Sequence, residues 1–274
     1  MLMTAIILIV LVMAYLLMIM PKICNKADFS KFGGYLYAHR GFFDNEGEAP
    51  ENSCRAFEMA VQSGYGIELD VQLSADNIPV VFHDWNLKRI CSLDAQLENL
   101  TVEQLKNYKM FHTEQKIPTL EEALETIHGK VPVIVELKSK KLDHVLYKEV
   151  MKVLKGYHGL YCIESFNPKC LRWFRNHHPE IVRGQLSSNH VFNRGERYYK
   201  FNFIFKNMLF NFVTKPDFVA YDIRGKHSLA FKICKNIYKV RTFGWTVRNE
   251  EELLKNQEKF DYIIFDSFKP HMVE

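Results

Sequence analysis

Closely spaced cysteines are missing from this sequence, although six of its 274 residues are cysteine. No two of them show the C-x-x-C spacing typical of zinc ligands. A chain of this length can bury a hydrophobic core without disulfide bonds. We therefore expect six free thiols in a reducing compartment, at Cys24, Cys54, Cys91, Cys162, Cys170 and Cys234.

A strong excess of charge is missing too, since the formal net charge is only +4. This mild excess suits anionic partners but does not indicate a nucleic-acid-binding protein. Hydrophobic residues make up 47% and charged residues 25% of the chain, an ordinary balance for a globular protein. The length fits one large domain or two small ones.

Charged residues do not occur at all before Lys22. Residues 1–20 are almost wholly apolar, and as a helix they extend about 30 Å, the thickness of a bilayer core. A cleaved signal peptide is the alternative, but it has a basic start, a shorter apolar stretch and a small-residue cleavage site. The sequence favours an uncleaved transmembrane anchor over residues 1–21, followed by a linker over residues 22–34.

Three lysines follow this apolar segment, at Lys22, Lys26 and Lys31. Positive charge next to a transmembrane helix favours the cytoplasmic side. We therefore expect a single-pass protein of the cell membrane with its large domain in the cytoplasm, in agreement with the free thiols.

Short β-rich runs alternate with helical stretches over residues 35–274. This alternation is typical of a parallel sheet covered by helices, and the number of runs favours a closed (β/α)8 barrel. The expected helices are 53–63, 119–128, 144–154, 168–176, 228–236 and 250–256. The expected strands are 35–39, 66–72, 79–83, 132–137, 160–165, 181–186, 217–221, 240–247 and 262–266.

Nine runs are one too many for eight barrel strands. Run 79–83 follows its predecessor too closely for a parallel crossover, and residues 74–77 have turn chemistry. We expect a hairpin here, with His83 beside Glu68.

Polar side chains recur at the ends of the expected strands. His39 and Arg40 end the first run, and Glu68 and Asp70 lie near the end of the second. In a parallel barrel the carboxyl ends of the strands form the active site. Further polar or aromatic side chains end later runs, at His83, Glu136, Lys138, Gln185, Asp222 and Trp245.

Three of these side chains are carboxylates that can surround one hard cation. Glu68 and Asp70 share one face of a strand, and Glu136 ends another strand. Oxygen ligands favour Mg²⁺ or Ca²⁺ over Zn²⁺. The alternative for any one of them is a salt bridge to Lys138 or Arg40.

The remaining side chains suit phosphate chemistry. His39 and His83 can exchange protons near neutral pH. Arg40 can bind a phosphate through its planar guanidinium group, and Lys138 can neutralise a second oxygen. Trp245 is either a flat wall for a substrate or a core aromatic residue.

Together these stretches resemble the glycerophosphodiester phosphodiesterase family of the phosphatidylinositol-phospholipase-C-like superfamily, in a membrane-anchored bacterial form. The resemblance extends over most of the chain after the anchor. It rests on motifs that occur in order and at the family's spacing: His39-Arg40-Gly41, Pro50-Glu51-Asn52-Ser53, Glu68-Leu69-Asp70-Val71, Val80-Val81-Phe82-His83-Asp84, Ile117-Pro118-Thr119-Leu120-Glu121-Glu122, Val135-Glu136-Leu137-Lys138, Trp245-Thr246-Val247 and Asp261-Tyr262-Ile263-Ile264-Phe265-Asp266.

The resemblance implies a barrel with a small insertion after the second strand, over about residues 75–118. It implies one divalent cation, Mg²⁺ or Ca²⁺, bound by Glu68, Asp70 and Glu136. His39 and His83 would be the acid–base pair, Arg40 and Lys138 would contact phosphate beside Trp245, and Glu51 and Asn52 would support the site.

The implied activity is hydrolysis of glycerophosphodiesters to glycerol phosphate and an alcohol, through a cyclic phosphate or by direct attack of water. Lysophospholipids or other membrane glycerophospholipids are alternative substrates. A phospholipase-C-like enzyme acting on inositol lipids and an inactive barrel that serves as a binding module are further alternatives.

Residues 201–213, FNFIFKNMLFNFV, are unusually apolar. A helix of this length extends about 20 Å, too short to cross a membrane. The segment is either a barrel helix buried in the protein or an apolar flap that lies on the membrane near the site. Arg194, Arg197, Lys200 and Lys206 would then lie near anionic headgroups.

Overall fold

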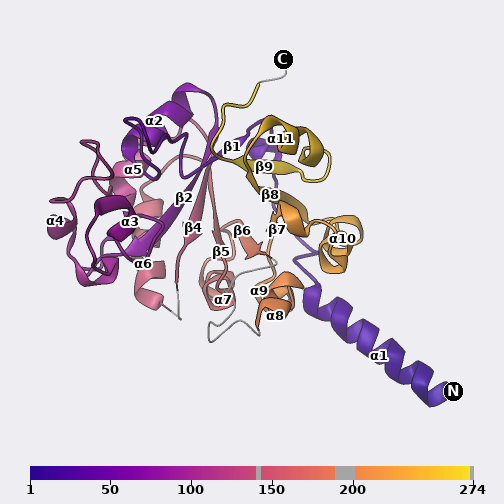
Figure 1. Ribbon diagram of the computed structural model, residues 1–274. Helices are drawn as coiled ribbons and strands as arrows, with labels where there is room; N and C mark the ends of the chain where they lie inside the picture. Colours follow the sequence, from indigo (N-terminus) through magenta and orange to yellow (C-terminus); the bar gives the residue numbers. More distant parts are fainter. Residues whose placement is uncertain (140–142, 189–200, 272–274) are drawn as a thin grey trace.

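A closed parallel barrel forms the body of the protein (Figure 1). The computed structural model describes residues 1–139, 143–188 and 201–271. Strand β1 pairs with both β2 and β9, which closes the sheet and confirms the predicted barrel. The strands are β1 (Tyr37–His39), β2 (Gly66–Leu73), β3 (Pro79–Val81), β4 (Val133–Leu137), β5 (Tyr161–Ser165), β6 (Arg183–Ser187), β7 (Phe218–Asp222), β8 (Arg241–Val247) and β9 (Tyr262–Phe265).

Helices surround this barrel, and most begin at a side-chain cap. Ser53 accepts a hydrogen bond from the Ala56 amide, and Thr119 forms the predicted capping box with Glu122. The helices of the outer layer are α2 (Cys54–Gln62), α5 (Leu120–Ile127), α6 (His144–Lys155), α7 (Pro168–His177), α8 (Asn202–Lys206), α9 (Asn211–Thr214), α10 (Leu229–Asn236) and α11 (Glu250–Asn256).

Side chains alternate along each strand between the helices and the barrel interior. Ile134 lies in the interior cluster with Tyr37 and Phe243, whereas Val133 and Val135 lie in the outer cluster. Since alternate residues share a face, Glu136 points to the same side as Ile134. The interior is therefore apolar toward the amino ends of the strands and carboxylate-rich toward their carboxyl ends.

Strand β3 is antiparallel to β2, which confirms the predicted hairpin. Val81 pairs with Val71, and the Phe82 amide donates to the Asp70 carbonyl (2.9 Å). The expected pairing of His83 with Glu68 is therefore wrong by one position. The turn accommodates one more residue than a tight hairpin does.

A small apolar cluster, separate from those of the barrel, lies beyond this hairpin. It includes Phe82 and packs under two short helices, α3 (Lys88–Cys91) and α4 (Val102–Leu105). The other buried members of this cluster are Val80, Leu87, Ile90, Leu97, Leu105, Met110 and Ile117.

The apolar segment 201–213 is not one helix. It forms α8 and α9, which are interrupted at Met208, where φ is +51°. Met208 and Asn211 are buried, whereas Phe203 and Phe212 are exposed. The interpretation as a buried barrel helix thus fits Met208 and Asn211, whereas the interpretation as an apolar flap fits Phe203 and Phe212. Arg194, Arg197 and Lys200 lie outside the described residues.

Helix α1 (Leu2–Ile19) extends away from the barrel (Figure 1). Among the described residues it is the one helix long and apolar enough to cross a membrane, with a mean hydropathy of 2.9. The chain that follows packs against the barrel, where Phe29 and Phe32 join the interior cluster. All six cysteines are free thiols, as predicted.

Gly184 in β6 has no room for a side chain, because an added Cβ would lie 2.1 Å from the buried Phe218 ring. We expect Gly184→Ala to lower the free energy of unfolding by about 1–3 kcal/mol through overpacking. Urea unfolding of the detergent-solubilised protein measures this. Gly156→Ala is the control, since its Cβ would make an ordinary contact of 3.5 Å with a carbonyl. Equal stability of the two variants would contradict the prediction.

Candidate active site

Three carboxylates meet at the carboxyl ends of β2 and β4. Asp70 lies opposite Glu136 in the strand register, and Glu68 lies two residues earlier on the same face. All three are buried, and one oxygen from each lies within 4.8 Å of the others. The structure therefore brings together the three predicted cation ligands.

Burial and mutual repulsion act on these carboxylates. The pKa of Glu68 is raised well above its ordinary value by burial and then by the charges of Asp70 and Glu136. Burial also raises the pKa of Glu136. Burial acts on the pKa of Asp70 in the same direction, but Lys138, His83 and Arg40 outweigh it and hold that pKa well below the ordinary range.

Asp70 also takes part in the ion pairs that the sequence left open as an alternative. Its Oδ2 lies 3.3 Å from Arg40 Nε, and its Oδ1 lies 3.4 Å from Lys138 Nζ. Lys138 is also 3.5 Å from Glu136. Ion pairing and a shared carboxylate cluster thus occur in the same group of residues.

The cluster fits a hard cation by two observations. Asp70 Oδ1 is buried and has no hydrogen-bond partner among the described residues. The carboxylates at this end of the barrel also outnumber their nearby cations, because Glu164 adds a fourth beside Glu136. A divalent cation would balance this buried negative charge.

Sequence reasoning missed Glu164. It is buried on β5, its Oε2 lacks a hydrogen-bond partner in the described part of the chain, and burial raises the pKa of its carboxyl well above the usual range. Its signal was available, because Glu164 ends an apolar run just as Glu136 does.

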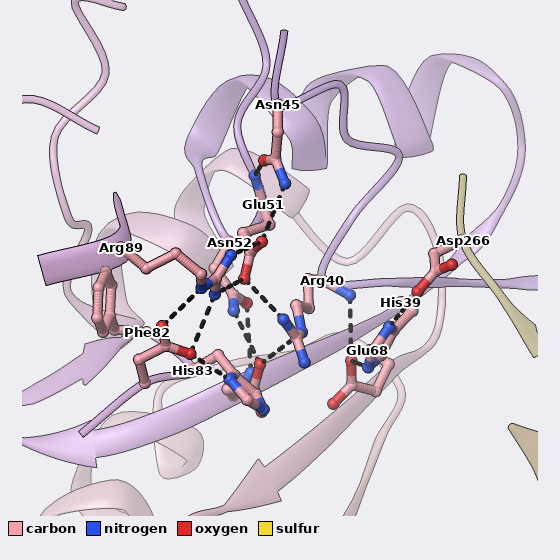
Figure 2. Close-up of polar contacts among 12 residues, drawn as sticks. His39, Arg40, Asn45, Glu51, Asn52, Glu68, Phe82, His83, Arg89 and Asp266 are labelled. Carbon is pink, nitrogen blue, oxygen red and sulfur yellow. Dashed lines mark hydrogen bonds and ion pairs between the residues drawn. The ribbon is translucent and has the colours of Figure 1, made fainter. Parts of the chain in front are cut away.

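His39 ends β1 and lies beside Glu68 (Figure 2). Its Nδ1 lies 2.9 Å from Oδ2 of Asp266, and its Nε2 lies 3.9 Å from Glu68. Burial and the charge of Arg40 lower the pKa of His39. Asp266 therefore orients the ring and leaves Nε2 facing the site. The sequence motif contained Asp266, but its partnership with His39 needed the tertiary structure.

His83 is held in the same way from the hairpin. Its Nδ1 lies 2.6 Å from Asp84 Oδ1, and Arg89 donates from Nε to the other oxygen of Asp84 at 2.7 Å. Asp70 lies within electrostatic reach of both His83 and His39. In each histidine the Nδ1 atom is hydrogen-bonded to an aspartate carboxylate, so Nε2 is the nitrogen that can contact a substrate.

Glu51 joins two arginines behind the site (Figure 2). Arg40 donates to it at 2.7 Å, and Arg89 donates with both terminal nitrogens at 2.8 Å. Burial tends to raise the pKa of Glu51, but the two arginines outweigh burial and lower this pKa to about 2. Glu51 therefore fixes the guanidinium of Arg40 and connects it to the hairpin arm.

Asn52 supports Asp70 directly. Its amide donates to Asp70 Oδ2 at 2.9 Å, and its own backbone N–H donates to the Arg40 carbonyl at 2.8 Å. Arg40 and Asn52 both have left-handed backbones, with φ of +58° and +61°. Gly41 follows at +82°, where a Cβ would lie 2.9 Å from that of Ala56. The two motifs thus hold each other in strained conformations.

Trp245 lies on β8, and its ring meets Phe166 edge to face at a centroid distance of 5.8 Å. It is half-buried, and its Nε1 has no hydrogen-bond partner within the described residues. Asp222 does not join the carboxylate cluster, since it accepts hydrogen bonds from Arg224 and Ser188.

Comparisons with known proteins agree with this geometry. Residues 39–269 match the model of the glycerophosphoryl diester phosphodiesterase family. A Bacillus subtilis protein named as a candidate glycerophosphodiester phosphodiesterase, YhdW, is 28% identical over 233 residues, which are 81% of this chain and 90% of the relative. The glycerophosphodiester phosphodiesterase of Bacillus altitudinis is 38% identical over 112 residues, 38% of this chain and 44% of the relative.

A solved structure is similar over nearly the whole barrel. It is a phosphodiesterase from Oleispira antarctica in complex with the product sn-glycerol-3-phosphate. The TM-score is 0.70 at 25% identity, and the match covers 86% of this chain and 94% of the other.

The contacts of Glu51 make a pH-dependent prediction. Its folded pKa of about 2 lies below the ordinary 4.5, so it adds stability above pH 4.5 that is lost as pH falls toward 2. We expect Glu51→Gln to lower the free energy of unfolding at pH 7 by about 3 kcal/mol, from the size of this pKa shift. Urea unfolding at several pH values measures the difference. Glu103→Gln, an exposed site, is the control, and a difference that did not shrink in acid would refute the prediction.

Proposed function

Because the chain belongs to the glycerophosphoryl diester phosphodiesterase family and is a phosphoric diester hydrolase, we propose that it hydrolyses glycerophosphodiesters to glycerol phosphate and an alcohol. One observation carries the proposal. Three buried carboxylates lie near two histidines: His39 Nε2 is 3.9 Å from Glu68, and His83 is within electrostatic reach of Asp70 and Glu136. The Nδ1 atom of each histidine is held by an aspartate.

Glu68, Asp70 and Glu136 would hold the cation, Mg²⁺ or Ca²⁺, which supplies Lewis-acid polarisation of a phosphate oxygen when bound. Their oxygen donors and their burial support this assignment, as does Asp70 Oδ1, which accepts no hydrogen bond from the described residues. Arg40 and Lys138 add fixed positive charge beside them, which would stabilise the charge that develops on the phosphate. Trp245 would form the wall against which the substrate rests.

The two histidines move the protons. One accepts the proton of the glycerol 2-hydroxyl, and that oxygen bonds to phosphorus while the bond from phosphorus to the departing alcohol oxygen breaks. The other histidine donates its proton to that alcohol. In the second step the roles exchange, and water opens the cyclic phosphate to give glycerol phosphate. Direct attack of water on the diester is the alternative route, and it gives no cyclic intermediate.

Lysophospholipids are the second candidate substrate. Phe203 on α8 is 67% exposed. The neighbouring carbonyls of Phe205 and Lys206 accept hydrogen bonds from Ser187 at the end of β6 and from Tyr221 near the end of β7. An apolar side chain thus lies at the end of the barrel that holds the site. The inactive-barrel alternative is less favoured, because all the predicted ligands and both histidines are present.

Helix α1 would anchor the enzyme in the cell membrane as a single span. Lys22, Lys26 and Lys31 follow it, so the barrel would lie in the cytoplasm. A signal sequence is the alternative for an apolar helix at this position.

An assay tests the activity directly. We expect the chelator-treated protein in detergent to release glycerol phosphate from glycerophosphocholine and glycerophosphoethanolamine only after Mg²⁺ or Ca²⁺ is added. His39→Ala and His83→Ala should each lower kcat by about 10²–10⁴, the usual contribution of acid–base catalysis. His112→Ala, an exposed histidine of the insertion, is the control.

Turnover without metal, or activity in the double variant of His39 and His83, would overturn the mechanism. A transient cyclic glycerophosphate detected by phosphorus NMR would favour the two-step route over direct attack of water. Hydrolysis of a lysophospholipid alone would make the lipid the substrate.

Cys24 is exposed just after α1 and reports the orientation of the protein. We expect a membrane-impermeant maleimide to label it only after cells are permeabilised, because a cytoplasmic barrel keeps Cys24 on the inner side. Cys24→Ser identifies the labelled position. Rapid labelling of Cys24 in intact cells would place the barrel outside.

A further inference from the structure

The carboxyl end of α1 packs against the outer layer of the barrel, next to α9. The last turn of any helix leaves carbonyl groups without partners inside the helix. Here the barrel supplies donors for them. Tyr238 Oη donates to the Leu16 carbonyl at 2.8 Å, and Asn211 Nδ2 donates to the Ile19 carbonyl at 2.9 Å.

Two further donors complete this docking site, which consists of Asn211, Lys215, Cys234 and Tyr238. Cys234 Sγ donates to the Ile19 carbonyl at 3.4 Å, and Lys215 Nζ donates to the Met20 carbonyl at 3.3 Å. The lysine charge also suits the negative end of the helix dipole. Ile19 and Asn211 are fully buried, so cleavage after α1 would leave a buried amide without its acceptor.

The connection to the barrel has no flexible spacer. The Lys22 amide donates to the Pro216 carbonyl at 3.1 Å, and Lys22 Nζ pairs with Asp217 at 2.8 Å. Eighteen residues of helix extend about 27 Å, close to the thickness of a bilayer core. Ile19 is already buried in the outer cluster between the strands and the helices, so α1 emerges directly beside the barrel.

The barrel surface around this docking site has the composition of a membrane interface. Figure 1 shows α1 leaving beside α9, with α8 and α10 nearby. Phe203 and Phe212 are exposed on α8 and α9, and Ile237 is 66% exposed just after α10. Lys206, Lys232 and Lys239 are exposed on or next to these helices, and Lys26 donates to the carbonyls of Tyr238 and Lys239. Apolar side chains mixed with lysine favour anionic lipid.

We propose that the docked end of α1 holds the barrel rigidly on an anionic bilayer, with α8, α9 and the end of α10 as the lipid-contacting surface. This inference rests on α1 as a membrane anchor and not on the catalytic proposal. It goes beyond anchoring, because a rigid joint fixes which face of the barrel meets the lipid. Helix α8 also reaches the end of the barrel that holds the site, through the hydrogen bond from Ser187 to the Phe205 carbonyl.

Fluorescent labelling of the full-length protein tests the surface. Phe203→Cys and Ile237→Cys are introduced one at a time in a background that lacks the three accessible thiols (Cys24→Ser, Cys54→Ser and Cys91→Ser) and carry an environment-sensitive dye, while the other three cysteines stay buried. The protein is reconstituted in vesicles of phosphatidylcholine and phosphatidylglycerol that contain a nitroxide-labelled lipid. We expect both dyes to be quenched. Leu254→Cys is the matched control, since Leu254 on α11 is 55% exposed and lies outside the proposed surface.

Variants that weaken the docking site distinguish docking of α1 on the barrel from anchoring of α1 in the membrane. Tyr238→Phe combined with Asn211→Ala removes two donors to α1, and the dye at position 203 should lose its quenching while the protein resists extraction by alkaline carbonate. Tyr238→Phe alone, which deletes one hydroxyl, should give a smaller loss. Hydrolysis of a soluble diester shows that these variants remain folded.

Two results would overturn the inference. Equal quenching at positions 203, 237 and 254 in protein that resists extraction would refute the lipid-contacting surface and leave the anchor intact. Extraction of the unmodified protein by carbonate would refute the anchor and the surface together. Neither result bears on catalysis, which the assay of soluble diesters measures separately.

Discussion

The burial of one carboxylate, that of Asp70, imposes the main constraint on this structure. An isolated buried charge is costly, and removing one partner of such a charge typically destabilises a protein by about 3–5 kcal/mol. Asp70 is compensated by the Asn52 amide, the Arg40 guanidinium and the Lys138 ammonium group. These partners come from three separate segments of the chain. Satisfying Asp70 therefore assembles around the candidate cation site the two cationic side chains that we propose to bind phosphate.

The same requirement extends outward through Glu51. It holds Arg40 on one side and Arg89 on the other, and Arg89 in turn binds Asp84, the partner of His83. The hairpin and its small apolar cluster are thus tied electrostatically to the first strand. A barrel with only eight strands has no element at this position, so His83 owes its place beside the carboxylates to the antiparallel β3 arm.

Much of the fold followed from local patterns. The alternation of β-rich and helical runs predicted the barrel, and the short spacing before residue 79 predicted the hairpin. The exact register did not follow, because one residue in the turn shifted His83 away from the expected pairing with Glu68. The break at Met208 was also missed, since hydrogen bonds from Ser187 and Tyr221 hold α8 in place and are not visible in the helix pattern.

For the site, the sequence by itself determined which side chains face the barrel interior at the carboxyl ends of the strands, because side-chain alternation depends only on strand position. It therefore identified Glu68, Asp70, Glu136 and His39. The tertiary structure decided their partners, since Asp266 meets His39 across 227 positions of sequence. It likewise decided that α1 docks through Asn211, because a buried amide finds its acceptor only when distant segments pack together.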